Sequence, residues 1–447
     1  MVTYKDTVDW YLSAFEGFEN GLNGQTGSEL HRVRRRAIER FVEIGFPTTR
    51  EEEWRFTNVA PIAEQQFTPV LTLSDDSIGH SVIEPFTLAG LKCVRLVFIN
   101  GHFSKRLSSL SAAPKGLKVG SLAGAIRTDP DLIGRHLAHY ADYTDNAFAA
   151  LNTAFMLDGA FVYVRGGKDV ELPIHLIFIS SDHDNRFVSH PRNLVIAEES
   201  ARVSIVESYV GLAANEYLTN AVTEIVLGEK AVVEHDQLQI EGPSGYHIGT
   251  LHVVQQRKSI FTSNSISLGG ALVRNNVKTV LAAEDSECTL NGLSLATSEQ
   301  LIDNHTTIDH TKPGCRSHEL YKAVLDGKSR GVFNGRIYVR KGAQKTDAKQ
   351  TNKTLLLSPD ATMDSKPQLE IFADDVKCTH GAAIGQLDEE QVFYLRSRGL
   401  GEDEARDILT YAFASDIINR IHVEALRKEL DRVLLKRLQE GRLKARE

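Results

Sequence analysis

Two runs near the middle of the chain, ARVSIVESYV (residues 201–210) and AVVEHDQLQI (residues 231–240), decide the class of fold. Both are rich in Val, Ile and Tyr, residue types that favour β-strands. Similar runs occur on either side of them: CVRLVFI (93–99), GAFVYV (159–164), PIHLIFIS (173–180) and GRIYVR (335–340). We therefore expect the stretch from about Leu91 to about Ile384 to be mainly β.

Two architectures can hold so many short strands: a sandwich or barrel of hairpins, and a solenoid of stacked parallel strands. Tight Asn-Gly hairpin signals are rare, the clear ones being Asn100-Gly101, Asn291-Gly292 and Asn334-Gly335. Many runs also lack a clean two-sided pattern of polar and apolar residues. Both observations favour a solenoid, although no strict repeat is visible and the spacing alone leaves both architectures open.

Helical patterns flank this β region. Before it, apolar residues at helical spacing predict a helix that starts after Ser28 and ends at Gly45: Leu30, Val33, Ala37, Phe41 and Ile44. After Gln391, helical spacing returns in a locally basic segment, which fits either an ordinary terminal helix or a partner-binding module. Within the β region, AHYADYTDNAFAALNTAF (138–155) predicts a helical insertion. We expect an N-terminal helical domain (1–90), a β core (91–390) and a C-terminal helical domain (391–447).

Composition limits the class of protein. The 447 residues carry a formal net charge of −8, so counterion release gives this chain no advantage in binding nucleic acid. Four cysteines, Cys93, Cys288, Cys315 and Cys378, form no CxxC motif. The N-terminus does not resemble a secretory signal, and no run of about 18 apolar residues could cross a bilayer. We expect a reduced, cytoplasmic protein.

Sequence motifs give little support to an enzyme. Asp326-Gly327-Lys328-Ser329 resembles the end of a phosphate-binding loop, but position 322 is Lys where that motif needs Gly, so we expect a turn. No GxGxxG or GxSxG motif occurs in a suitable context. A free-standing β-solenoid enzyme, such as a carbohydrate-active lyase or a metal-dependent hydrolase, would use carboxylates, for which Asp374, Asp375 and Glu207 are candidates.

Two groups of residues could bind a metal. His305, His310, Cys315 and His318 have suitable donor atoms, but their spacing matches no standard structural zinc pattern. A structural zinc protein is therefore a further alternative. The second group is Cys378-Thr379-His380, in which a strand would place the thiol and the imidazole on one face. That pair alone does not complete a ligand set.

The stretch from LYKAVLDGKSRG to EEQVFYLRSRGL (residues 320–400) resembles the shared core of the SufB/SufD family of iron–sulfur cluster assembly proteins. The similarity extends more weakly over most of the chain, and EEEWRFTNV (51–59) is similar to the N-terminal domain of SufD. TNKTLLLSPDA (351–361) carries Leu where SufB-type sequences place Cys. DDVKCTHGAAIG (374–385) has the SufD-like Cys-x-His. The chain therefore resembles SufD more than SufB.

The resemblance implies a right-handed parallel β-helix core between N- and C-terminal helical domains. It implies a non-ATPase scaffold that builds nascent Fe–S clusters with a SufB-like partner, contacted through the β-helix, and delivers them to apo-proteins. His380, with Cys378 beside it, is then a candidate ligand of a transient cluster shared with the partner. A homodimer of the chain alone is left open.

The resemblance also implies that ATP hydrolysis belongs to a separate SufC-like ATPase, which docks on the C-terminal helices, and that this chain binds no nucleotide. The contact with the ATPase begins at residues near the start of the C-terminal domain: Phe393, Tyr394, Arg396, Arg398 and Gly399. A cluster usually needs four thiolate or imidazole ligands, which one Cys-x-His pair cannot supply. A partner that supplies the remaining ligands would remove that shortage.

Overall fold

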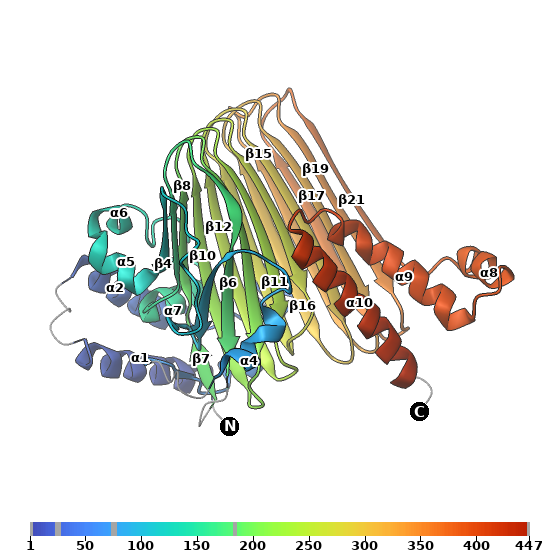
Figure 1. Cartoon of the computed structure of the whole chain (residues 1–447), viewed down its shortest axis with the longest axis horizontal. Helices are drawn as coiled ribbons and strands as arrows, with labels where there is room; N and C mark the ends of the chain where they lie inside the picture. Colours follow the sequence, from blue (N-terminus) through green and yellow to red (C-terminus); the bar gives the residue numbers. More distant parts are fainter. Residues whose placement is uncertain (1–2, 23–27, 73–77, 182–185, 445–447) are drawn as a thin grey trace.

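The computed structural model describes residues 3–22, 28–72, 78–181 and 186–444. Two large sheets stack side by side along the chain and form a β-solenoid, with helices at both ends of the sequence (Figure 1). The first sheet runs in the order β20 (Thr362–Ile371), β18 (Arg330–Val339), β16 (Leu301–His310), β14 (Leu272–Leu281), β12 (Gly245–Gln255), β10 (Tyr217–Leu227), β8 (Arg192–Ala197), β5 (Ala160–Val164) and β4 (Leu117–Ser121), with β7 (Phe187–Ser189) and β1 (Thr68–Pro69) joined beside β10.

The second sheet runs in the order β21 (Lys377–Gly385), β19 (Asp347–Leu356), β17 (Arg316–Leu325), β15 (Glu287–Ala296), β13 (Ile260–Ser267), β11 (Val232–Ile240), β9 (Arg202–Gly211), β6 (Asp169–Ser180), β2 (Val94–Ile99) and β3 (His102–Phe103). From β8 onward, consecutive strands alternate between the sheets, and each pairs in parallel with the strand two further along. Arg316 pairs with Asp347 and Asp347 with Lys377, a spacing of 31 and 30 residues (347−316 and 377−347).

This pairing confirms the expected β-solenoid with helices on both sides, and the sandwich or barrel alternative is wrong. The hairpin signals were few because, apart from the antiparallel pairs β2–β3 and β4–β5, successive strands do not pair with each other. A single residue with positive φ turns the chain at many corners, for example Lys230 (φ 57°) and Gly327 (φ 66°). Between the sheets lies an apolar core in which one residue per turn stacks on the next, as in the column Val203, Val233, Phe261 and Cys288.

Most of the N-terminal helices cover the outer side of the first sheet: α1 (Tyr4–Asn20), α2 (Glu29–Ile44), the short η2 (Glu52–Trp54) and α3 (Ala60–Ala63). The next two, α4 (His80–Ile83) and η3 (Glu84–Phe86), lie on the second sheet, where Ile83 shares a buried cluster with Val97 and Ile177. The helix expected after Ser28 is α2: the Ser28 side chain accepts the His31 N–H at 3.1 Å, and Gly45 ends the helix with a φ of 64°.

The helix expected over 138–155 is shorter than predicted. It comprises only α7 (Ala147–Phe155), which packs against α2, while α5 (Leu122–Thr128) and α6 (Pro130–Gly134) precede it. The Asn146 side chain caps α7 by accepting the Ala149 N–H at 3.0 Å. Upstream, the buried Glu224 carboxylate accepts backbone N–H groups of Ala138, Tyr140 and Ala141 at 2.9 Å each, which holds that segment in a turn.

The C-terminal helices α8 (Glu389–Ser397), α9 (Glu402–Ile418) and α10 (Glu424–Lys444) follow the last strand. α9 and α10 lie across the outer face of the second sheet, where Ile417 and Leu426 share a buried cluster with Leu238 and Ile266, whereas α8 projects away from the solenoid (Figure 1). Among the helices of the described ranges, none combines the length and the apolar composition that a bilayer span requires.

The buried carboxyl group of Asp236, beneath these helices, makes the stability of the fold depend on pH. It is 1% exposed and points to the same side of β11 as Leu238; Asn264 donates to its Oδ1 at 2.7 Å, and its Oδ2 has no hydrogen-bond partner in the described structure. Burial raises the pKa of Asp236 to about 7. Between pH 4 and 7 the folded state therefore binds more protons than the unfolded state, and the free energy of unfolding falls as the pH rises.

Asp236→Asn removes this penalty. We expect Asp236→Asn to raise the free energy of unfolding by about 2–4 kcal/mol more at pH 8 than at pH 4, measured by urea unfolding at both pH values. The exposed Asp131→Asn on α6 is the control and should change stability by less than about 0.5 kcal/mol. Equal effects of Asp236→Asn at the two pH values would contradict the buried position of this carboxyl.

Candidate functional site

The solenoid has an open end, formed by β20 and β21. β20 is the terminal strand of the first sheet and β21 that of the second, and they pair along one edge, with β18 and β19 respectively. Every residue of β21 except Cys378 is exposed, whereas half of β19 is buried. A free strand edge offers backbone N–H and C=O groups to a strand of another chain. Ile371, Phe372 and Ile384 add exposed apolar side chains to this end.

Cys378 and His380 lie on this terminal strand, in register with Ala348 and Gln350 of β19. Cys378 packs against the cluster that contains Ile337 and Ala348, so its thiol faces the space between the sheets. Alternate residues of a strand point to the same side, so His380 faces that way too. Burial raises the pKa of the Cys378 thiol, and the His380 side chain is exposed. The structure thus places a thiol and an imidazole side by side at the open end.

The residues expected to contact an ATPase lie on and just after α8. Phe393 and Tyr394 are 72% and 56% exposed. The Arg398 guanidinium lies over the Tyr394 ring, 5.0 Å from its centroid, and Arg396 pairs with Glu402 at 3.2 Å. Gly399 follows the helix with a φ of 96°. This projecting helix presents an aromatic surface flanked by arginines, separate from the open end.

The four residues of the possible zinc site do not converge. His310 is buried and its Nε2 lies 2.9 Å from Ser317 Oγ, Cys315 Sγ contacts the Ala283 carbonyl oxygen at 3.3 Å, and His318 is exposed on the second sheet. His305 lies on the first sheet, in a polar network of its own. Within the described ranges, no group of three or more His, Cys, Asp and Glu side chains is arranged to hold a metal ion. The structural zinc alternative is therefore not supported.

The carboxylates considered for an enzyme are also separated. Glu207 is 2% exposed inside the solenoid, where it bonds to His235 at 2.9 Å and to Thr223 at 3.1 Å. Asp375 pairs with Lys345 at a surface corner. These groups do not face a common groove, so a paired-carboxylate mechanism is not supported.

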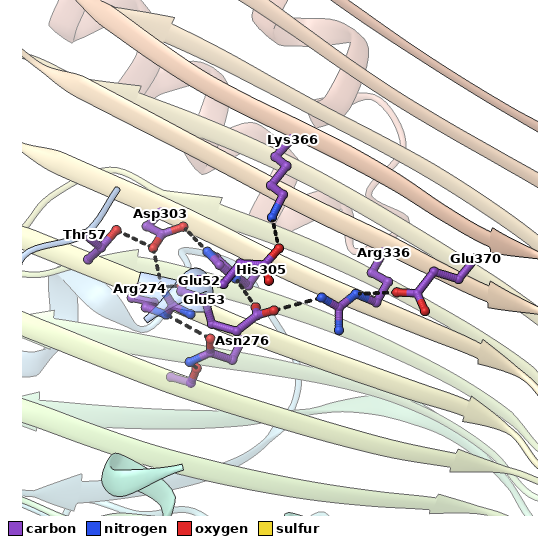
Figure 2. A network of polar contacts seen from close by, with 11 residues as sticks. Glu52, Glu53, Thr57, Arg274, Asn276, Asp303, His305, Arg336, Lys366 and Glu370 are labelled. Atoms are coloured by element: carbon purple, nitrogen blue, oxygen red, sulfur yellow. Dashed lines mark hydrogen bonds and ion pairs between the residues drawn. The ribbon is translucent and has the colours of Figure 1, made fainter. Parts of the chain in front are cut away.

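One polar network was missed by the sequence reasoning (Figure 2). The segment EEEW (51–54) lies on the outer face of the first sheet, where Glu53 contacts His305 Nδ1 at 3.3 Å and Arg336 at 2.9 Å, and Glu52 pairs with Lys366 of β20. The His305 hydrogen bond lowers the pKa of Glu53 to about 2. With Arg274 of β14, which donates to the Glu53 carbonyl oxygen at 2.8 Å, the network binds the N-terminal segment to four strands and reaches the open end.

The centre of this network is buried. Arg274 pairs with Asp303 at 2.7 Å, with 3% and 0% of their side chains exposed, and its guanidinium lies 3.7 Å from the Trp54 ring centroid. Burial acts to raise the pKa of Asp303, but His305 and Arg274 together lower it to about 2. The signal available in the sequence is the i, i+2 spacing of Arg274-x-Asn276 and Asp303-x-His305 on outward strand positions, which becomes informative only once the register is known.

Arg274→Met leaves the Asp303 carboxylate buried without its partner. We expect a loss of about 3–5 kcal/mol in unfolding free energy and faster backbone hydrogen exchange in residues 51–57, measured by mass spectrometry. Arg316→Met is the matched control: Arg316 pairs with Glu287 at 3.5 Å on the surface, 63% and 48% exposed, so the loss should stay below about 1 kcal/mol. Equal losses of unfolding free energy in the two variants would show that the buried Arg274–Asp303 pair contributes no more to stability than an exposed pair.

Comparisons with known proteins agree over most of the chain. A family model described as "SUF system FeS cluster assembly, SufBD core domain" matches residues 178–413, and one for the "SufBD protein N-terminal region" matches residues 5–176. The chain is 33% identical to an iron–sulfur cluster assembly SufBD family protein of Synechocystis, covering 92% of this chain and 91% of the relative. It is 31% identical to the iron–sulfur cluster assembly protein SufD of Escherichia coli, covering 88% and 89%. SufB of Bacillus subtilis is 26% identical, covering 93% and 86%.

Proposed function

The chain belongs to the SufBD family of iron–sulfur cluster assembly proteins, and we propose that it acts there as the SufD-like scaffold subunit, without ATPase activity of its own. Because both SufD and SufB proteins are among its relatives, the choice of SufD rests on two sequence features. These are the Leu-rich TNKTLLLSPDA and the Cys-x-His of DDVKCTHGAAIG. A cytoplasmic location is part of this proposal.

One observation carries the proposal: Cys378 and His380 lie on an exposed terminal strand with a free edge. A second solenoid, SufB-like, can add its strands to β20 and β21 and bury the apolar side chains around them. The thiol and the imidazole supply two donors to a nascent Fe–S cluster, and the neighbouring chain supplies the remaining donors. The cluster is cargo, built at the boundary and released to apo-proteins. In the absence of that partner, a second copy of this chain can use the same edge and form a homodimer.

The C-terminal helices support a second contact in this proposal. Phe393 and Tyr394 on α8 expose large aromatic surfaces on a helix that projects from the solenoid, and aromatic side chains near arginines are typical centres of protein interfaces. We assign this surface to a SufC-like ATPase. Nucleotide binding and hydrolysis would then occur on that subunit.

His380→Ala tests the role of the open end. Because His380 is exposed, its removal should leave folding and complex formation intact and lower the iron and acid-labile sulfide bound by the reconstituted three-subunit complex by at least about tenfold. His318→Ala, an exposed histidine on β17 of the same sheet, is the matched control and should have no effect. An unchanged cluster yield in His380→Ala would rule out the proposed role.

Two aspartate substitutions test the two partner surfaces against each other. Ile384→Asp at the open end should abolish capture of the SufB-like chain and keep capture of the ATPase, and Phe393→Asp should do the reverse, because each buries a charge in one interface only. Ile260→Asp, at a similarly exposed isoleucine on β13 (40% against 47%), is the control and should keep both. Pairwise pull-downs of purified chains give the measurement. Loss of both partners in either variant would contradict two separate surfaces.

A further inference from the structure

A column of polar side chains leads from the solenoid interior to His380. Glu319 of β17 is in register with Gln350 of β19, and Gln350 with His380 of β21. Glu319 and Gln350 are 3% and 1% exposed, and Gln350 Nε2 donates to Glu319 Oε2 at 2.6 Å. One turn deeper, the same column holds Leu290. Below Leu290 the column holds Ser263 and His235, so it mixes polar and apolar side chains, and its last three members before the open end are all polar.

Burial of the Glu319 carboxyl group lowers the stability of the fold. Its carboxyl group is fully buried, no ion pair with a cation is described for it, and burial raises its pKa to about 7. The Thr306 hydroxyl and the Gln350 amide both act against this rise in the pKa, but neither carries a charge. A buried carboxyl group with only neutral partners is less favourable than an apolar side chain of similar size. Packing does not explain a glutamate at this position.

Gln350 is held in one orientation. Its Nε2 donates to the Glu319 carboxyl group, whereas its Oε1 is buried without a hydrogen-bond partner in the described structure. Gly335 of β18 lies opposite, and a Cβ atom at that position would overlap Gln350 Nε2, so glycine leaves the space that the carboxamide fills. Because oxygen and nitrogen lie on different sides of a carboxamide, the free acceptor lies away from Glu319, and His380 is the next residue of the column.

We propose that Glu319 is a positioning residue for His380, acting through Gln350; this rests on the proposed role of His380 as a ligand. The Glu319 carboxyl group holds the amide so that its oxygen is free to accept one ring N–H of His380 when a partner covers the open end. The other ring nitrogen then keeps its lone pair and faces the interface, where it can bind iron. Histidine ligands generally donate their second ring N–H to such an acceptor, which fixes tautomer and orientation. A flipped amide would present donors to His380 and favour the wrong tautomer.

The test uses the complete complex of this chain with its SufB-like and SufC-like partners. Glu319→Leu and Gln350→Met should each lower the iron and sulfide bound by about 10–100-fold. Glu319→Gln, whose amide oxygen still accepts from Gln350 Nε2, should stay within about threefold of the parent protein. The double variant Glu319→Leu/Gln350→Met leaves no buried amide without its partner and should not lower the melting temperature, whereas a merely structural Glu319 predicts a less stable variant. Thr354→Val is the control: Thr354 is equally buried on β19, its hydroxyl also has no partner in the described ranges, and it lies outside the column.

The ring nitrogens of His380 give a second readout that needs no iron. The complex is prepared with 15N-labelled histidine in this chain and studied by solid-state NMR, and the signals of His380 are identified by their loss in His380→Gln. We expect one neutral tautomer of His380 in the parent protein and in Glu319→Gln, and a mixture of the two tautomers in Glu319→Leu. A mixture in the parent, or the same single tautomer in Glu319→Leu, would overturn the inference. Full cluster yield in Glu319→Leu together with loss in His380→Ala would overturn it while the proposed function stands. Unchanged yield in His380→Ala would instead overturn the proposed function.

Discussion

The structure depends on one constraint: each strand pairs in parallel with the strand two positions further along the chain. This pairing places one residue of every turn above its equivalent in the turn before, so side chains form columns along the solenoid axis. A column of apolar residues makes a continuous core, and a column of polar residues makes a continuous hydrogen-bonded path. The same constraint leaves the last strand of each sheet without a neighbour, because no further turn follows β20 and β21.

The interior is not uniformly apolar. In the earlier turns aliphatic and aromatic side chains such as Ile205, Phe261 and Leu290 share the space between the sheets with the buried polar group around Glu207. Near the open end, three of the four buried inward positions of β19 are polar, namely Gln350, Asn352 and Thr354, and each has an oxygen with no partner in the described ranges. Unsatisfied buried acceptors cost roughly 1–3 kcal/mol each, so these residues make the last turn less stable than apolar side chains at the same positions would. Binding of a second chain over that end would offset part of this cost.

Much of the fold could be predicted from sequence, since the runs rich in Val and Ile are strands and the apolar spacing after Ser28 is a helix. The end of α7 was predicted, but its start was not, because Asn146 caps the helix and Glu224, distant in sequence, holds the segment before it. Cys378 and His380 were found through a short motif. The buried column beneath them and the network around Arg274 were not, because their members are about 30 to 250 residues apart and become neighbours only through register.

The two ends of the solenoid differ. At the beginning, β3 and β4 run antiparallel to their neighbours and are only two and five residues long, and helices lie nearby. At the other end, β20 and β21 are ten and nine residues long, β20 mostly half-buried and β21 mostly exposed. Short antiparallel strands are poor templates for another chain. A solenoid with a free strand edge at one end only can add one further solenoid by strand pairing, so pairing through these edges would give two joined solenoids and not a filament.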